Sequence, residues 1–174
     1  MARSRFGIIA SLLFTPRESI RDPLVVVEDG RILSVASRES TDAPANLRIV
    51  NFPDAVLGPG FVDIHIHGGA GHDVMEGDED ALAAIEGHLA RNGTTSYFPT
   101  TVTAPVDATL RSLEKLGAAI ERSGNGYLRA QPLGVHLEGP FISHAKRGIH
   151  PAEYIQPPSL ELFDRMWQAA GGHV

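Results

Sequence analysis

Three consecutive stretches after Gly58 each join a β-prone run to an amphipathic helical pattern, and this alternation constrains the fold more than any other feature. The β-prone runs are "FVDIHIHG", "TTSYFPTTVT" and "PLGVHLEGPFI". The helical patterns that follow them cover residues 78–92, 106–122 and 158–170. Strands that alternate with helices in this way form parallel sheets through right-handed crossovers. The sequence therefore predicts an α/β protein with a parallel sheet.

Each helical pattern carries one apolar stripe that we expect to be buried. Asp78 is the expected N-cap of the first helix, and Gly93 is the residue expected to end it. The predicted stripes are Leu82, Ile85 and Leu89 in the first helix, Leu110, Leu113, Leu116 and Ile120 in the second, and Leu160, Phe163 and Trp167 in the third.

Three parallel strands leave two unpaired edges, and parallel sheets are normally closed or covered. The last residues, "GGHV", are typical of the start of a fourth strand. We therefore expect residues 58–174 to be the first three βα units of a (β/α)8 TIM-like barrel. On this interpretation, the chain is the first part of a longer protein whose barrel is incomplete here.

Residues 1–57 differ from the rest, with short β-prone runs joined by turns. One run covers Phe6–Phe14, and two others flank Asp29 and Gly30 in "LVVVEDGRILSVA". Asp-Gly between two apolar runs is the usual signal for a type I′ β-hairpin. We expect these residues to form a small antiparallel unit that precedes the barrel.

Composition removes several classes of function. The formal net charge is −6 and no run of Lys or Arg exceeds two residues, which argues against binding to nucleic acid or to an anionic membrane. No apolar stretch approaches the roughly 20 residues of a membrane span. The chain has no cysteine, which excludes disulfides and thiolate ligands and fits a reducing cytoplasm. Any metal must therefore be held by His, Asp or Glu.

Two histidines near the end of the first predicted strand are candidate metal ligands. Alternate residues of a strand share a face, so Asp63, His65 and His67 lie on one face. The other face, with Val62, Ile64 and Ile66, is expected to be packed. Two imidazoles at this spacing can meet at one ion, with Asp63 available to orient a ring. Solvated histidines near a strand end are the alternative, although catalytic groups of barrels lie at such ends.

The third predicted strand repeats this arrangement. His136 and Glu138 share one face, and Glu138 is expected at the same level of the sheet as His67. A carboxylate inside a barrel is costly unless it is paired or bound to a cation. The alternative to a metal ligand is a structural ion pair between Glu138 and Lys146 or Arg147.

Other polar residues are weaker candidates. His72 and Asp73 follow the first strand and are interpreted as loop residues, and His88 is expected on a helix surface. The loop "KRGIH", residues 146–150, suits an anionic or sugar substrate, although a solvated loop has the same composition. No phosphate-binding glycine motif or serine-hydrolase motif occurs.

Taken together, "GPGFVDIHIHGG", "NGTTSYFPTTVT" and "PLGVHLEGPFISHAKRGIHP" resemble the amidohydrolase superfamily, and within it the N-acetylglucosamine-6-phosphate deacetylase family. The resemblance covers essentially the whole chain but only the amino-terminal half of such an enzyme. It implies a (β/α)8 barrel beside a small β-sandwich that is built from both chain ends. Residues 1–57 would then be the amino-terminal part of that sandwich, and residues 58–174 the amino-terminal part of the barrel.

The resemblance also implies an activity. Family members use a divalent metal, Zn or Fe, as one or two ions, to hydrolyse the N-acetyl group of N-acetylglucosamine 6-phosphate. The products are glucosamine 6-phosphate and acetate, in cytoplasmic amino-sugar catabolism, and the full-length enzyme is expected to be a homodimer. The 174 residues alone are expected to be inactive.

Individual residues can be assigned through the same resemblance. Glu138 resembles the family's metal-binding glutamate, and Ile149 and His150 fall where the family contacts the amino sugar. His65 and His67 match paired ligands that some members use for a second metal, whereas other members have non-ligand residues there. The family's two further metal histidines and its catalytic aspartate are expected beyond residue 174, so no catalytic residue is assigned within the chain.

Two other functions remain open at this point. Another amidohydrolase, dihydroorotase-like or a deaminase, would share His65 and His67, although the glutamate of "HLEGPF" argues against the carboxylated lysine common in dihydroorotases. A non-catalytic barrel fragment is the alternative from a different class.

Overall fold

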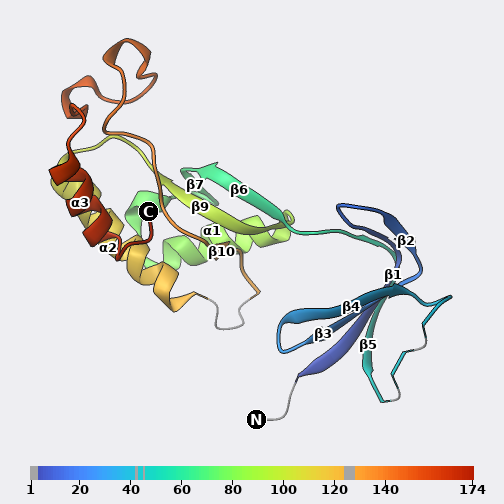
Figure 1. Ribbon diagram of the computed structural model, residues 1–174. Coiled ribbons are helices and arrows are strands. Elements are labelled where there is room, and N and C mark those ends of the chain that lie inside the picture. The colour runs from blue at the N-terminus through green and yellow to red at the C-terminus, as the bar shows by residue number, and fades with distance from the viewer. Residues whose placement is uncertain (1–3, 42, 45, 124–127) are drawn as a thin grey trace. The chain divides into compact units, whose positions relative to one another are not determined.

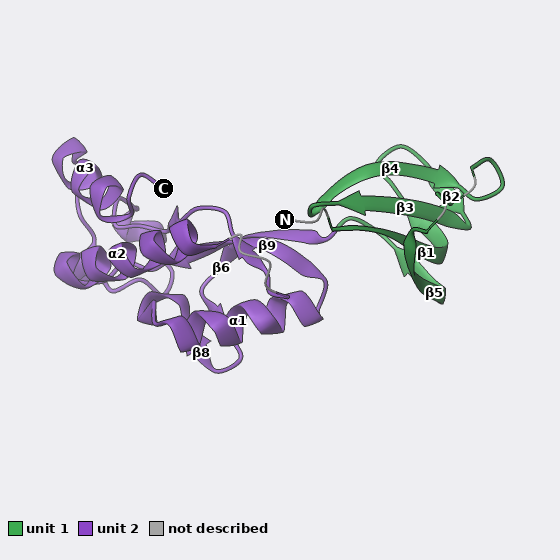
Figure 2. Cartoon of the chain, turned by 90° about the horizontal axis from the view of Figure 1, so that it is seen from below, with its two compact units in different colours: residues 1–59 green, residues 60–174 purple. Residues whose placement is uncertain are grey.

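The computed structural model describes residues 4–41, 43–44, 46–123 and 128–174. The chain divides into two compact units, Met1–Pro59 and Gly60–Val174, and each is considered by itself (Figure 2). The first unit contains only strands, whereas the second combines a parallel sheet with helices (Figure 1). Within the described ranges, no helix has both the length and the apolar character needed to cross a bilayer.

The first unit is a five-stranded sheet. Its strands are β1 (Arg5–Phe14), β2 (Ser19–Arg21), β3 (Pro23–Glu28), β4 (Arg31–Ser37) and β5 (Arg48–Leu57). The predicted hairpin is confirmed, since Asp29 and Gly30 join β3 to β4 with φ of 49° and 77°. The expectation of a purely antiparallel unit is wrong, because β5 pairs with β1 in parallel. The long connection after β4 returns the chain to the other end of the sheet before β5 begins, which a parallel pair requires.

The second unit is organised around strand β9 (Thr94–Thr101). It pairs in parallel with β6 (Phe61–Ile66) and with two short strands, β10 (Gln131–Pro132) and β11 (His136–Leu137). The helices are α1 (Glu79–Arg91), α2 (Val106–Arg122) and α3 (Leu160–Ala169) (Figure 1). Short elements lie between them: β7 (Gly68–Gly69), β8 (His72–Asp73), and the 3-10 helices η1 (Val74–Glu76), η2 (His144–Lys146) and η3 (Ala152–Tyr154). The predicted alternation of parallel strands and helices is present.

The third predicted strand is interrupted rather than continuous. Between β10 and β11, the N–H of Leu133 donates to the carbonyl of Tyr97 on β9, whereas that of Val135 donates to the carbonyl of His173 at 2.6 Å. The backbone between β10 and β11 therefore bonds partly to β9 and partly to the end of the chain at His173. After Glu138, Gly139 adopts a φ of 92°, which takes the chain out of strand geometry.

The first helix buries its predicted stripe, the second buries its stripe except for the half-buried Leu110, and the third does not bury its stripe. Leu82, Ile85 and Leu89 are at most 6% exposed, as are Leu113 and Leu116 of α2. In α3, the predicted residues Leu160 and Trp167 are 84% and 43% exposed. The buried side of α3 consists of Leu162, Met166, Ala169 and Ala170.

Close packing of α2 against the end of α3 explains the choice between these two stripes. A Cβ on Gly117 would lie 2.5 Å from the carbonyl oxygen of Ala170. The two helices can approach this closely only because small residues meet there. The stripe of Met166, Ala169 and Ala170 faces this contact, and Trp167 lies on the exposed side of the helix.

Two further expectations need correction. Asp78 occupies the N-cap position of α1, but its carboxylate makes no capping bond and instead accepts from Lys115 Nζ at 2.8 Å. The second face of β6 is only partly packed, because Ile66 contacts the core while Val62 and Ile64 are 54% and 70% exposed. Among the described strands, β6 has only β9 as a partner, and α1 covers only one end of its outer face.

A carboxyl group between α1 and β9 provides a stability prediction. Burial raises the pKa of Glu86 above its ordinary value of 4.5, against the opposing hydrogen bond from Tyr97 and the charge of Arg129. Above pH 4.5 the Glu86 carboxyl ionises readily in the unfolded chain, whereas burial opposes its ionisation in the folded chain. The contribution of this group to the free energy of unfolding therefore falls as the pH rises. We expect Glu86→Gln to raise the melting temperature by a few degrees at pH 7 and by almost nothing at pH 4. Thermal unfolding at both pH values tests this, and an equal change at both would contradict it.

Candidate metal centre

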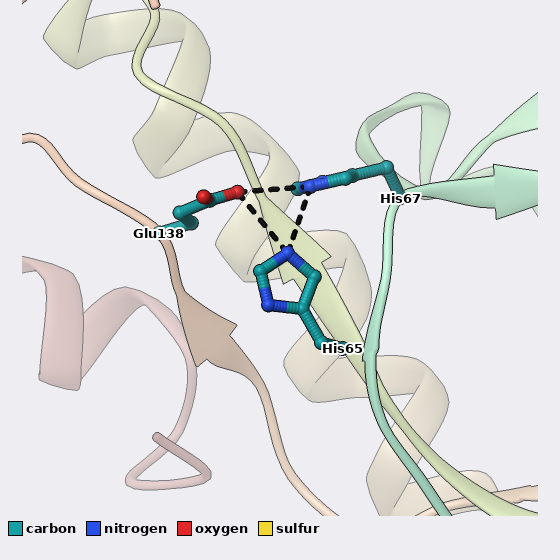
Figure 3. A group of neighbouring side chains, drawn as sticks. All are labelled: His65, His67 and Glu138. Atoms are coloured by element: carbon teal, nitrogen blue, oxygen red, sulfur yellow. Dashed lines mark hydrogen bonds and ion pairs between the residues drawn. The ribbon is translucent and has the colours of Figure 1, made fainter. Parts of the chain in front are cut away.

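Side chains from β6 and from the end of β11 converge on one point above the sheet (Figure 3). His65 Nε2 and His67 Nε2 lie 3.1 Å apart. Glu138 Oε2 lies 3.2 Å from His65 Nε2 and 2.9 Å from His67 Nε2. The predicted shared face of β6, and the predicted level of Glu138 beside His67, therefore bring these three side chains together.

Strand pairing accounts for this convergence. β6 and β11 both pair in parallel with β9, so their carboxyl ends reach the same edge of the sheet. His67 follows the last residue of β6, and Glu138 follows the last residue of β11. Backbone carbonyl and hydroxyl groups of Thr100 on β9 contact the rings of His67 and His136. The site is thus built on the ends of strands, where barrel chemistry is located.

The donor atoms fit a divalent metal ion. Two atoms that each bind Zn²⁺ at 2.0–2.1 Å lie about 3.3 Å apart at the tetrahedral angle, close to the separations of 2.9–3.2 Å found here. His67 Nδ1 faces the carbonyl of Thr100 at 3.0 Å and must donate to it. When the His67 ring is neutral, the lone pair of its Nε2 then points at the Glu138 carboxylate, and the two groups repel each other. A cation between them would be attracted to both, so these residues could hold a metal.

Glu138 is surrounded by histidines. Although burial pushes the pKa of Glu138 upward, the hydrogen bond from His150 and the charges of His150, His65 and His67 together lower it. The carboxylate is therefore the stable form at neutral pH. The ion pairs recorded for Glu138 are to these three histidines, so the alternative pairing with Lys146 or Arg147 is not supported. Arg147 instead donates to the carbonyl of His150 at 2.7 Å.

His150 is the most deeply buried histidine near the site, with 6% exposure. Its Nδ1 accepts from the backbone N–H of Thr103 at 3.1 Å and lies 2.8 Å from the Thr103 hydroxyl. In the neutral ring the proton is consequently on Nε2, which faces Glu138 Oε1 at 3.4 Å. His150 thus contacts the carboxylate oxygen that is turned away from His65 and His67.

A cavity of about 320 Å³ opens beside these groups. His67, Glu138 and the loop from Lys146 to His150 line it. Ile149, which the sequence suggested as a substrate contact, is 89% exposed at its rim, whereas His150 forms part of its wall. Four of the predicted site residues, His67, Glu138, Ile149 and His150, therefore line one cavity, and its lining is both cationic and apolar.

The weaker candidates lie outside this cluster. His72 pairs with Glu76 at 3.3 Å, and Asp73 is the N-cap of η1 in a capping box, so both have local structural roles. His88 is exposed on α1. Sequence reasoning missed Thr100 and Thr103, because threonines in a β-prone run indicate only a strand.

The chain is similar in sequence and in structure to known proteins. No family model matches the chain. N-acetylglucosamine-6-phosphate deacetylase from Bacillus subtilis is 39% identical over 165 residues, which cover 93% of this chain and 41% of that protein. N-acetylgalactosamine-6-phosphate deacetylase from Escherichia coli O157:H7 is 32% identical, over 90% of this chain and 39% of that protein. The chain therefore spans about two fifths of the length of these relatives.

A solved structure agrees with these matches. The chain is similar to a mutant N-acetyl-D-glucosamine-6-phosphate deacetylase from Mycobacterium smegmatis, solved in complex with N-acetyl-D-glucosamine-6-phosphate. The TM-score is 0.82 with 28% sequence identity, and the match covers 98% of this chain and 42% of the other. The α/β fold described above is thus found in a structure of that enzyme.

Proposed function

Because this chain belongs to the N-acetylglucosamine-6-phosphate deacetylase family, we propose that it serves, within a longer protein, in metal-dependent hydrolysis of N-acetylglucosamine 6-phosphate. The products would be glucosamine 6-phosphate and acetate. The observation that carries the proposal is the meeting of His65, His67 and Glu138 beside a cavity at the carboxyl ends of parallel strands. Neither a dihydroorotase-like enzyme nor a deaminase is favoured by the two sequence relatives described above.

We infer the architecture of the longer protein from the same relationship. Residues 58–174 would be the first three βα units of a (β/α)8 barrel, and residues 1–57 the amino-terminal part of a small β-sandwich. The division of the chain after Pro59 supports this arrangement. The exposed Val62 and Ile64 also support it, because a further helix of a closed barrel would cover them.

The proposed cofactor is Zn or Fe, as one or two ions held by Glu138, His65 and His67. When bound, such an ion would lower the pKa of a bound water toward about 7 and would polarise the acetamide carbonyl. Within this chain, His65, His67 and Glu138 are the residues that would hold the ion. Glu138 contributes a negative charge, and His150 donates to the oxygen of Glu138 that does not face the histidine pair. The general base would be supplied from outside residues 1–174.

The proposed substrate site is the cavity beside Glu138. Ile149 would pack against the sugar at the rim, and His150 would contact it from the wall. Lys146 and Arg147 give that side of the cavity positive charge, which favours a phosphorylated sugar. A cytoplasmic location and a homodimeric full-length enzyme complete the proposal, and the absence of cysteine supports the former.

The proposal is tested on what we call the completed chain, residues 1–174 joined to the further segments that the relatives carry. Acetate release is measured with N-acetylglucosamine 6-phosphate and, for comparison, N-acetylgalactosamine 6-phosphate, because one relative is named for the second sugar. We expect faster release from the glucosamine derivative, loss of release after chelation, and its return with Zn²⁺ or Fe²⁺. Release that is unaffected by chelation, or absent with both sugars, would refute the proposed function.

A further inference from the structure

We propose that Thr100 is a positioning residue that holds His65 and His67 in place to share one metal ion with Glu138, an inference that rests on the proposed function. Thr100 lies in the middle strand β9 and is completely buried. Its hydroxyl contacts the β6 backbone and the His136 ring, and its carbonyl contacts the His67 ring. It does not itself reach the convergence point of the three ligand atoms.

The first observation is an irregularity in the pairing of β6 with β9. The register shifts between Asp63 and Ile66, the segment that carries His65. Within this segment, side chains replace ladder bonds: the N–H of His65 donates to Asp63 Oδ1 at 3.0 Å, and the N–H of Ile66 donates to Thr100 Oγ1 at 3.0 Å. Such bulges redirect side chains near active sites. The Thr100 hydroxyl therefore anchors the irregular segment between the two histidines.

The second observation is that the bonding of this hydroxyl is complete. Thr100 Oγ1 donates to the carbonyl of Phe98 at 3.0 Å and accepts from Ile66. His136 Nδ1 lies 3.3 Å from the same oxygen and can fill its remaining acceptor position. The His136 ring in turn packs edge-on against His65, with 5.0 Å between ring centroids. Loss of the hydroxyl would free both the Ile66 amide and the ring that supports His65.

The third observation concerns the Thr100 carbonyl. It accepts from His67 Nδ1 at 3.0 Å, which leaves the lone pair of Nε2 directed at the point shared with Glu138. A backbone partner of this kind fixes the tautomer and orientation of a ligating histidine. Thr100 thus controls His67 through its carbonyl, and controls His65 through its hydroxyl and His136.

The test compares Thr100→Val, which removes the hydroxyl at almost constant size, with Thr100→Ser, which keeps it. The measured quantity is the Zn²⁺ dissociation constant of the completed chain, obtained by competition with a chelator. Loss of an outer partner of a metal ligand typically weakens binding by 10–100-fold. We expect weakening of about that size in Thr100→Val and a change within about twofold in Thr100→Ser.

Thr101→Val is the matched control, because Thr101 is the next residue of β9, is 1% exposed and lies on the opposite face. It should leave the dissociation constant unchanged, even if both valine variants melt earlier. Should Thr100→Val fail to fold, Thr100→Ala removes the same hydroxyl without the added methyl group, and the same weakening is expected.

A measurement on the unsubstituted protein tests the carbonyl contact. Nitrogen chemical shifts of the His67 ring in the metal-free neutral form should show the proton on Nδ1. The opposite tautomer, normal Zn²⁺ affinity in Thr100→Val, or weakening in Thr100→Ser or Thr101→Val equal to that in Thr100→Val would overturn the inference. Failure of the unsubstituted protein to bind either Zn²⁺ or Fe²⁺ would instead reject the proposed function on which it rests.

Discussion

Glu138→Gln in the completed chain is expected to weaken binding of the divalent metal by well over tenfold and to remove most acetate release. Glutamine keeps the size of the side chain but removes the charge that faces His65 and His67. Its amide group would also place N–H donors where a cation needs oxygen lone pairs. Removing a ligand should cost more than the 10–100-fold typical for loss of an outer partner. Metal content after dialysis and acetate release are the two measurements.

The control for this variant is Glu153→Gln, which removes the same charge from an exposed position in η3. It should leave metal content and turnover unchanged. If Glu138→Gln retained both, Glu138 would be a structural partner of the surrounding histidines, and the assignment of the metal centre would be wrong.

Residues 1–174 alone are expected to release no acetate above the uncatalysed rate, although the completed chain does. Metal-assisted hydrolysis needs a full set of ligands with one open position, a base within hydrogen-bond reach and a cavity that excludes bulk water. The described residues bring together one cluster of three ligand groups, and the neighbouring cavity is open to solvent. An acetate assay on both proteins at equal concentration measures the difference.

Residues 1–174 alone and the completed chain should also differ in their tendency to aggregate. Exposed Val62 and Ile64 lie on β6, whose only partner among the described strands is β9. Such an apolar, unpaired edge favours association between copies, so residues 1–174 alone should aggregate more readily than the completed chain. Light scattering during the assay measures this aggregation.

Equal acetate release by both proteins would show that the proposed barrel completion and the proposed position of the base outside residues 1–174 are mistaken.

Local patterns in the sequence predicted most elements of the second unit. The bounds predicted for the second helix agree with α2 at Val106–Arg122, because a single apolar stripe defines its buried side. The alternation in "FVDIHIHG" placed His65 and His67 on one face, since the period of a strand is two residues. Both predictions depended only on neighbours along the chain.

The features that sequence reasoning missed depend on contacts between distant segments. α3 has two apolar stripes, and the close approach of Gly117 to Ala170 decides which one is buried. The role of Thr100 depends on a register shift between two strands, and no local pattern reports such a shift. The contact between Thr103 and His150 joins residues that are 47 positions apart. Such contacts can be seen only in the folded chain.

The central position of β9 also determines the order in which the strands of the second unit can pair during synthesis. Among the described residues of the second unit, every parallel pair includes β9, so the sheet that these residues form cannot begin to assemble before this strand has been synthesised. During synthesis β6 emerges first, but it must wait without a partner until residues through Thr101 have left the ribosome. Parallel pairing also requires the intervening helix to close a long loop, which slows folding. The growing chain thus exposes its histidine-bearing strand longest, and a chaperone would most need to protect this segment.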